Sequence, residues 1–398
     1  MTIRLSHRAK AIKASPTLAV SALAKQMKAK GIDVLNFGVG EPDFNTPDYI
    51  KEAGKKAIDD NFTRYTAAAG IMELREAISA KLKRDNNLDC NPNDIIVSPG
   101  AKAAIINILM SVCDPRDEIL IPSPYWVSYT SQVEMMDALP VLLPTTISSK
   151  FKITAEQLEE KILSLSSSKA LILNSPNNPT GSVYNKQELE KIAEICLKYN
   201  ILIISDEIYE KLIYDGEKHI SIASLSDEIR EITVLINGVS KAYAMTGWRL
   251  GYAAGPTEII KRAIRIQSHT TSNVNSMTQK AALAALTQDD GSVEKMRKTF
   301  EKRRNFLVDK LNKIEHIKCL LPKGAFYTMP NVAYYLNNKK NINTSAKLCE
   351  YLLREYRIAL VPGSAFGAEK YIRFSYATSM ENIEEGVKRL EKGLKNLL

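Results

Sequence analysis

The sequence has few residues of the kinds that build metal sites or disulfide frameworks. Its 398 residues include only 4 histidines and 5 cysteines. The cysteines are odd in number, far apart and free of Cys-x-x-Cys spacing, so a disulfide framework is not expected. The histidines show no metal-ligand spacing with one another or with nearby carboxylates. We therefore predict no metal site.

Long apolar runs are also lacking. No stretch approaches the roughly 18 apolar residues that a membrane-spanning helix needs. Residues 1–32 contain lysines and arginines but no acidic residue, a bias that organelle transit peptides share. This region nevertheless lacks the apolar core of a secretory signal. These absences predict a cytoplasmic protein with no membrane partner.

A dense block of basic residues is missing as well, although the formal net charge is +9. The lysines are spread over helical segments together with glutamates, which is typical of a solvated surface rather than of a nucleic-acid site. No nucleic-acid partner is expected. Part of the positive excess can instead attract small anions such as phosphates and dicarboxylates.

The middle of the chain alternates short apolar runs with longer helical patterns, which indicates a mostly parallel sheet covered by helices. Between two of these runs, Leu189, Ile192, Ala193 and Cys196 follow helical spacing and are expected to face the sheet. A second, smaller unit is expected to combine the N-terminal arm with residues after about Gly291. The predicted strands are Ile95–Ser98, Glu118–Ile121, Ala170–Asn174, Ile201–Ser205, Thr233–Ile236 and Gly251–Ala254.

The segment from Ser240 to Arg249 pairs a lysine, Lys241, with an arginine eight residues later. A lysine amine can lose its proton when it is desolvated or lies near another cation, and it then attacks aldehydes. An arginine stays charged and makes a forked contact with phosphate or carboxylate. Taken alone, Lys241 would most simply be a surface lysine.

That segment resembles the lysine segment of class I aminotransferases, which use pyridoxal 5'-phosphate (PLP) and share the aspartate aminotransferase fold. Four further segments match the family in the same order, so the likeness covers nearly the whole chain from about Arg4. They are Gly38–Phe44, Asn174–Gly181, Ser205–Tyr209 and Tyr371–Ala377. The match leaves no length for a cleaved leader. A match to any one segment would be weak evidence, but five matches in the same order are specific evidence for the family.

The resemblance implies the type I fold of PLP-dependent transferases: an α/β protein with a mostly parallel central sheet and a smaller α/β domain. The large PLP-binding domain is expected at residues 46–290. Residues 1–45 and 291–398 are expected to form the discontinuous small domain. A long helix around Gly291 to Lys313 would bridge the two. The resemblance also implies a homodimer with shared active sites.

The resemblance assigns three catalytic residues. Lys241 would bind the cofactor aldehyde covalently and later move a proton at the substrate. Asp206 would keep the pyridine nitrogen protonated, which makes the ring a better electron sink. Tyr209 and Asn178 would donate hydrogen bonds to the phenolate oxygen of the cofactor. Without the resemblance, each residue also has a purely structural explanation. Asp206 would be a helix N-cap, Tyr209 a core residue and Asn178 a turn residue.

The cofactor phosphate is expected where a strand ends and a helix opens, because free backbone N–H groups point at one spot there. Gly100, Ala101 and Lys102 form this turn, with alanine where the family usually has a second glycine. By resemblance, Arg249 and Ser240 would complete the cofactor site. Tyr65 would reach the phosphate of the other subunit. Trp126 would stack on the ring, with a purely structural role as a core aromatic as the less favoured alternative.

Recognition of the substrate is expected from further matching residues. Arg373 would bind the α-carboxylate with a fork, and Gly40 would add its backbone N–H, while Trp126 and Asn178 border the same space. The chain resembles the bacterial aspartate aminotransferase subgroup Ib, in which Lys102 and Thr17 would bind the distal carboxylate. Lys13 matches a lysine that accompanies use of prephenate in some members, or it is simply an exposed lysine.

The resulting prediction is an aspartate:2-oxoglutarate aminotransferase with a ping-pong mechanism, and with prephenate as a possible further acceptor. Its partners would be small amino acids and 2-oxo acids. Fold and cofactor motifs do not separate this from an aromatic or broad-specificity aminotransferase or from a carbon–sulfur lyase. A lyase would not need a second carboxylate contact. A transcription regulator would need a DNA-binding domain, for which the match leaves no room.

Overall fold

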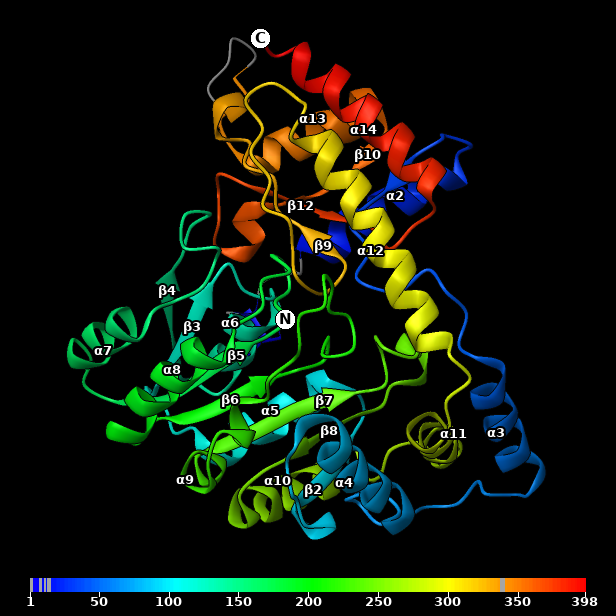
Figure 1. Ribbon diagram of the computed structural model, residues 1–398, viewed down its shortest axis with the longest axis vertical. Coiled ribbons are helices and arrows are strands. Elements are labelled where there is room, and N and C mark those ends of the chain that lie inside the picture. The colour runs from blue at the N-terminus through cyan, green and yellow to red at the C-terminus, as the bar shows by residue number, and fades with distance from the viewer. Residues whose placement is uncertain (1–2, 7–8, 11, 13–15, 337–340) are drawn as a thin grey trace.

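The computed structural model describes residues 3–6, 9–10, 12, 16–336 and 341–398, and these form a large unit with a smaller one above it (Figure 1). A seven-stranded sheet forms the centre of the large unit, in the order β2-β8-β7-β6-β5-β3-β4. Its strands are β2 (Ile95–Ser98), β3 (Glu118–Ser123), β4 (Leu139–Pro144), β5 (Ser168–Asn174), β6 (Leu202–Asp206), β7 (Thr233–Gly238) and β8 (Gly251–Ala254).

The prediction of a mostly parallel sheet is confirmed. Strands β4, β3, β5, β6 and β7 pair in parallel, and only β8 runs against its two neighbours. Each of the six predicted strands is present, with ends that differ by up to two residues. The carboxyl ends of the parallel strands meet at one edge of the sheet, where ligands of open α/β sheets collect.

Helices cover both faces of this sheet because successive strand residues point to opposite sides. Ile204 and Val234 pack in the cluster of α5 and α10, whereas Ile203 packs with α7 and α8, and Leu235 packs with α4 and α11. The helices of the large unit are α3 (Asp48–Asp59), α4 (Met72–Asn86), α5 (Ala101–Val112), α6 (Ser128–Met135), α7 (Ala155–Leu163), α8 (Lys186–Lys198), α9 (Asp227–Glu231), α10 (Thr257–Thr270) and α11 (Ser276–Thr287).

Helix α8 illustrates how the sequence fixes such an element. Asn185 caps its first turn by accepting from the backbone N–H of Glu188, whose side chain accepts from the Asn185 N–H in return. This capping box satisfies backbone groups that a helix start leaves without partners. The apolar residues predicted to face the sheet, from Leu189 to Cys196, are all buried against it.

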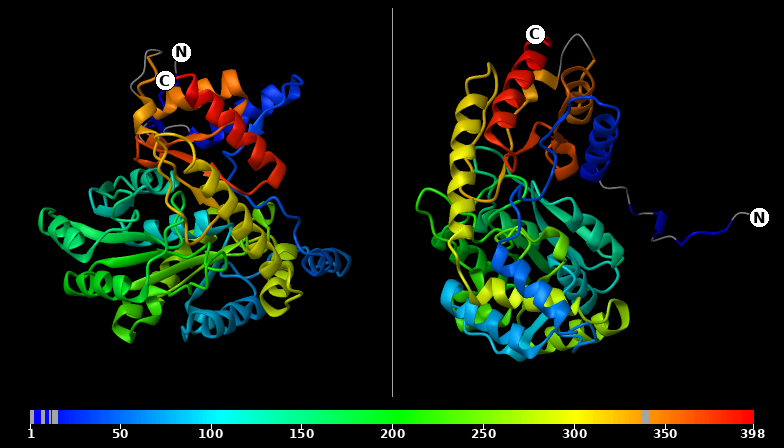
Figure 2. Two further views of the ribbon diagram at one scale, coloured as in Figure 1. Left: turned by 45° about the horizontal axis from the view of Figure 1, so that its top comes forward. Right: turned by 90° about the vertical axis from the view of Figure 1, so that its right-hand side faces the viewer.

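The small unit joins the beginning of the chain to its end. Strand β1 (Leu35–Asn36) pairs in parallel with β10 (Ile358–Ala359), and β12 (Ile372–Ser375) pairs with β11 (Val361–Pro362) and β9 (Tyr327–Thr328). Its helices are α2 (Pro16–Ala29), α13 (Ser345–Tyr356) and α14 (Met380–Lys395). Helix α12 (Ser292–Leu311) runs from the large unit up into the small one, at the position predicted for a bridging helix (Figures 1 and 2).

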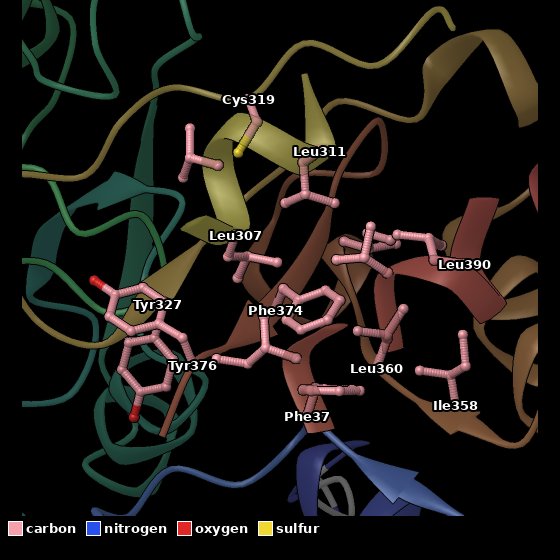
Figure 3. Packing of buried hydrophobic residues seen from close by; sticks show 14 of the residues in the cluster. Phe37, Leu307, Leu311, Cys319, Tyr327, Ile358, Leu360, Phe374, Tyr376 and Leu390 are labelled. Carbon is pink, nitrogen blue, oxygen red and sulfur yellow. The ribbon is translucent and has the colours of Figure 1, made fainter. Parts of the chain in front are cut away.

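A separate hydrophobic core holds the small unit together (Figure 3). Leu307 and Leu311 of α12 meet Leu390 of α14 and Phe374 of β12 in one buried cluster. The ring of Phe37, from the N-terminal segment, lies 4.2 Å from that of Phe374 between centroids. The segment around Phe37 is thereby fixed against residues more than 300 positions later, so the early and late parts of the small unit share one core.

Strand β4 was not anticipated from the sequence. It contains Pro140 and Pro144 and lies at the sheet edge, where most of its residues are exposed or half-buried. Proline is tolerated at an edge because it removes no ladder hydrogen bond there. Within the described ranges, no helix is both long and apolar enough to cross a membrane.

Candidate active site

A cavity of about 480 Å³ lies at the carboxyl edge of the large sheet and is bordered on its other side by the small unit. Asn174 and Asp206 are the last residues of β5 and β6. Trp126 and Tyr129 follow β3, and Lys241 follows β7. From the small unit come Gly38, Gly40, Tyr327 and Arg373. Most of the predicted site residues therefore meet in one space.

Asp206 lies at the bottom of this cavity and is 4% exposed. Its Oδ1 accepts from the backbone N–H of Ile208 at 3.2 Å, and its Oδ2 accepts from the hydroxyl of Tyr129 at 2.6 Å. Among the described residues it forms no ion pair, and burial raises the pKa of Asp206 to about 6. A buried carboxylate of this kind is stabilised by a cationic hydrogen-bond donor, which a protonated pyridine nitrogen would supply.

Lys241 has the surroundings that favour a reactive amine. Its Nζ donates to the carbonyl oxygen of Gly40 at 2.6 Å and lies 5.8 Å from the centre of the Tyr209 ring. Burial lowers the pKa of Lys241 to about 8, although the nearby Glu41 carboxylate acts in the opposite direction. A lowered pKa increases the neutral, nucleophilic fraction at physiological pH.

The turn before α5 provides an anion site. Gly100 has a φ of 91°, which a glycine adopts without strain, and a Cβ there would lie 2.7 Å from Nη2 of Arg249. The glycine lets Arg249 approach the helix start, where the N–H groups of Ala101 and Lys102 are available. Helix α5 begins at Ala101, so Ala101 and Lys102 both belong to its first turn.

Two cations lie beside this turn. The pKa of Lys102 is lowered by burial and by the charge of Arg249, and its Nζ lies 5.0 Å from the centre of the Trp126 ring. Arg249 donates to the carbonyl oxygens of Thr246 at 3.0 Å and Pro99 at 3.4 Å, and its remaining N–H donors make no hydrogen bond among the described residues. Two neighbouring positive charges at a helix N-terminus favour a multiply charged anion such as a phosphate.

Arg373 is held at the opposite side of the cavity, on β12. It is 3% exposed and donates to Asn178 Oδ1 at 3.0 Å and to the carbonyl oxygen of Gly38 at 2.8 Å. Its guanidinium lies 4.5 Å from the centre of the Tyr327 ring, and its Nε has no partner among the described residues. A buried guanidinium with an unsatisfied donor is suited to bind a carboxylate.

Tyr209 and Asn178 lie between Lys241 and Arg373 and are buried. The hydroxyls of Tyr209 and Tyr327 are 3.0 Å apart. Because Asn178 Oδ1 accepts from Arg373, the amide nitrogen of Asn178 is left as a donor toward the cavity. Gly40 and Ser240 also line the cavity. Tyr129 and Tyr327 were not singled out from the sequence.

Tyr65 is not among the described residues that line this cavity. It is 90% exposed on the surface of the chain. Its segment is nevertheless held firmly. The fully buried Gln279 accepts from Ile71 N and donates to Thr66 Oγ1, at 2.8 and 3.0 Å. Gln267, equally buried, donates to the Ala68 carbonyl at 2.7 Å. A large exposed aromatic on such a rigid segment is suited to contact another chain.

Two predicted substrate residues are not described in full. Thr17 lies in the first turn of α2, and its side chain is outside the described part, as is the whole of Lys13. Ser21 and Lys25, one and two turns beyond Thr17 on the same helix, line the cavity. Helix α2 therefore contributes to the wall from which these two residues were predicted to act.

The predicted absence of a metal stays a prediction. Glu207, Glu210 and His219 have possible ligand atoms within 4.8 Å of one another. In the described structure Lys81 forms an ion pair with Glu210, and Ser205 and Ser221 donate to Glu207. Lys81, Ser205 and Ser221 thus already neutralise or bind much of the negative charge and many of the lone pairs of this cluster.

The residues present fit the cofactor that the resemblance implies. The cavity holds a shielded amine, an acceptor for a ring cation and an anion site, at Lys241, Asp206 and Arg249 respectively. The indole of Trp126 and the donors of Tyr209 and Asn178 border the same space. These groups match an aldehyde, a pyridine nitrogen, a phosphate and a phenolate oxygen, which are the groups of PLP.

Comparison with known proteins agrees with this fit. The model of the family described as aminotransferase class I and II matches residues 32–390. The chain is 46% identical to an aspartate aminotransferase of Bacillus sp. strain YM-2, over 98% of this chain and 99% of that one. It is 45% identical to a probable aspartate/prephenate aminotransferase of Aquifex aeolicus, over 99% of each. The solved structure of an aspartate aminotransferase from Rhizobium meliloti is similar with a TM-score of 0.95, at 38% identity and with complete coverage of both chains.

Proposed function

Because the chain belongs to the class I and II aminotransferases, we propose that it transfers the amino group of L-aspartate to 2-oxoglutarate, with PLP as its cofactor. The products are oxaloacetate and L-glutamate. The observation that carries this proposal is the single cavity that joins Lys241, Asp206 and Arg373. The two half-reactions follow a ping-pong order, since donor and acceptor use the same carboxylate contacts in turn.

The bound cofactor supplies an aldehyde and an electron-withdrawing ring. Lys241 would hold that aldehyde, and its amine, when free, would move a proton at the substrate Cα. Asp206 holds a proton on the ring nitrogen. Tyr209 and Asn178 donate to the phenolate oxygen and stabilise its charge. Trp126, which lines the cavity, would cover the ring and exclude water from it.

The turn at Gly100, with Ala101 and Lys102, holds the phosphate by backbone N–H groups. Arg249 adds a charge-assisted contact, and Ser240 borders the same group. For the substrate, Arg373 binds the α-carboxylate, and the backbone N–H of Gly40 adds a further donor.

A dicarboxylate substrate requires a second cation. Lys102, and not Lys25 of the same cavity, is the proposed candidate because its charge is poorly solvated and already repelled by Arg249. Thr17 supports the same carboxylate from α2. Lys13 is proposed to favour prephenate, which the name of the Aquifex aeolicus relative includes. Five free thiols are consistent with the reducing cytoplasm that we propose as the location.

Lys102→Ala is expected to lower kcat/KM for aspartate and glutamate by roughly 2 to 4 kcal/mol, about 30- to 1,000-fold. The reason is that the substrate's second carboxylate would then be buried without its partner. Phenylalanine, which has no second carboxylate, should lose much less. Steady-state kinetics with each donor measure this difference. Lys25→Ala, at another lysine of the same cavity, is the control. Equal losses for aspartate and phenylalanine would assign Lys102 to the phosphate instead.

The enzyme is proposed to be a homodimer in which Tyr65 reaches the phosphate in the partner's cavity. Mixing Tyr65→Phe with Lys241→Ala subunits should create heterodimers with one wild-type site each, or about a quarter of all sites after random exchange. Turnover at limiting PLP measures this recovery. Each parent protein assayed alone gives the baseline. If Tyr65 served its own subunit, the mixture would have no wild-type site and no activity would return.

A further inference from the structure

The hydroxyl of Tyr129 is the side-chain partner of Asp206 in the described structure. Its 2.6 Å hydrogen bond to Oδ2 is short, as expected when the acceptor is a carboxylate. From the described part of the chain, the second oxygen of Asp206 accepts only the longer hydrogen bond of the Ile208 N–H, at 3.2 Å. Burial and the Asp206 charge hold the pKa of Tyr129 far above its usual range. The hydroxyl therefore keeps its proton and remains a donor.

The charged groups around Asp206 do not replace this bond. Glu207, the residue that follows β6, raises the pKa of Asp206, and Lys241 lowers it from across the cavity. Tyr209, buried nearby, carries no charge at neutral pH because burial keeps its pKa high. The hydroxyl of Tyr129 thus makes the closest contact that favours the ionised carboxylate.

Tyr129 is fixed by its own packing. It lies in the first turn of α6 and is 2% exposed, within the cluster that also contains Ile172 and Val133. Its ring meets that of Trp126 edge to face, with centroids 5.3 Å apart. Gln132, one turn later, donates to the carbonyl oxygen of Lys102 at 2.9 Å. Helix α6 therefore connects the ring-stacking residue, the carboxylate and the phosphate turn.

We propose that Tyr129 is a positioning residue that keeps Asp206 ionised and turned toward the cavity, so that the shared proton stays on the cofactor's ring nitrogen. This inference rests on the proposed function. A hydrogen bond to a carboxylate lowers its proton affinity. Without the Tyr129 hydroxyl, the proton shifts from the ring nitrogen to Asp206, and the ring loses the positive charge that makes it an electron sink.

The test compares Tyr129→Phe with Tyr184→Phe. Tyr184 is equally buried and its hydroxyl accepts from Ile153 N–H at 3.0 Å, so its loss also removes a buried hydrogen bond but leaves Asp206 untouched. In the cofactor-free proteins, the Asp206 carboxyl is titrated by ¹³C NMR and assigned with Asp206→Asn. Tyr129→Phe should raise the midpoint by about one to two pH units, and Tyr184→Phe should leave it unchanged.

A second measurement uses the loaded enzyme. With PLP labelled at the ring nitrogen, ¹⁵N NMR should show Tyr129→Phe moving toward the neutral pyridine, while Tyr184→Phe matches wild type. The kcat for aspartate should fall at least about tenfold with KM changed less than about threefold, because the change acts on the electron sink and not on substrate binding. Equal effects of the two variants on the ¹⁵N shift and kcat would overturn the proposal.

A variant that strengthens the Tyr129–Asp206 hydrogen bond distinguishes the proposed effect from a folding defect. Incorporation of 3-fluorotyrosine at position 129 makes the hydroxyl a better donor and should lower the Asp206 midpoint. An unchanged or raised midpoint in the fluorinated protein overturns the inference. The titration in cofactor-free protein does not depend on transamination, so a correct midpoint without aspartate turnover would refute the proposed function and leave the Tyr129–Asp206 contact established.

Discussion

Lys241→Ala is expected to abolish nearly all turnover while the protein still folds and binds PLP non-covalently. Loss of a positioned general base typically costs about a hundred- to ten-thousand-fold, and the covalent hold on the cofactor is lost as well. The site makes this loss specific. Lys241 Nζ lies against Gly40 O and under the Tyr209 ring, and no other described lysine takes part in that contact. Turnover with aspartate and absorbance of the bound cofactor measure both effects.

The conservative variant Lys241→Arg separates the effect of the positive charge from the effect of the reactive amine. It keeps a cation near Asp206 and Glu41 but offers no amine that loses its proton at neutral pH. We expect it to be as inactive as Lys241→Ala. Near-normal transamination by either variant would contradict the assignment of Lys241. Circular dichroism and melting temperature, compared with wild type, check that the loss is not one of folding.

Arg373→Leu is expected to lower kcat/KM for every amino acid by roughly 2 to 5 kcal/mol, about 30- to several-thousand-fold. Every substrate has an α-carboxylate, and the guanidinium that would bind it is buried and stacked on Tyr327. The substitution also leaves Asn178 Oδ1 and the Gly38 carbonyl without their donor. Steady-state kinetics with aspartate and phenylalanine measure the loss.

Arg373→Lys is the control because it keeps the charge but not the fork. It should recover only part of the lost efficiency, since a point charge does not reproduce two parallel hydrogen bonds. The Arg373 variants and Lys102→Ala are expected to differ in which substrates they affect. The Arg373 variants should affect aspartate and phenylalanine alike, whereas Lys102→Ala should affect mainly aspartate. A loss confined to dicarboxylates in Arg373→Leu would contradict the α-carboxylate role.

The central strands could be predicted because they are short, apolar and separated by helical patterns. Strand direction was harder, since an apolar run such as Gly251–Ala254 is the same in either direction. Only the structure shows that β8 is antiparallel to β2 and β7. Edge strand β4 was missed because Pro140 and Pro144 interrupt its pattern and little of it is buried. Pairing with β3 along its whole length, and not local sequence, makes that segment a strand.

The candidate site residues were found where a short motif contains them, as for Lys241 and Asp206. Tyr129, Tyr327 and Gln279 were missed because each is an ordinary residue in an ordinary helix or strand. Their importance comes from contacts with residues far away in the sequence. A usable signal for Tyr129 was its place three residues after Trp126, which puts both on one side of a helix start. Nothing comparable marks Gln279.

The order of the site residues along the chain bears on how the protein is made. Asp206, Lys241 and Arg249 all precede the end of β8, whereas Tyr327 and Arg373 belong to the small unit and come much later. At synthesis rates of about 5–20 residues per second, the proposed carboxylate contact leaves the ribosome several seconds or more after the proposed cofactor contacts. A nascent chain at that stage has the groups that would hold PLP but lacks the arginine that would hold an amino acid. Activity would thus be the last property that a newly made subunit acquires.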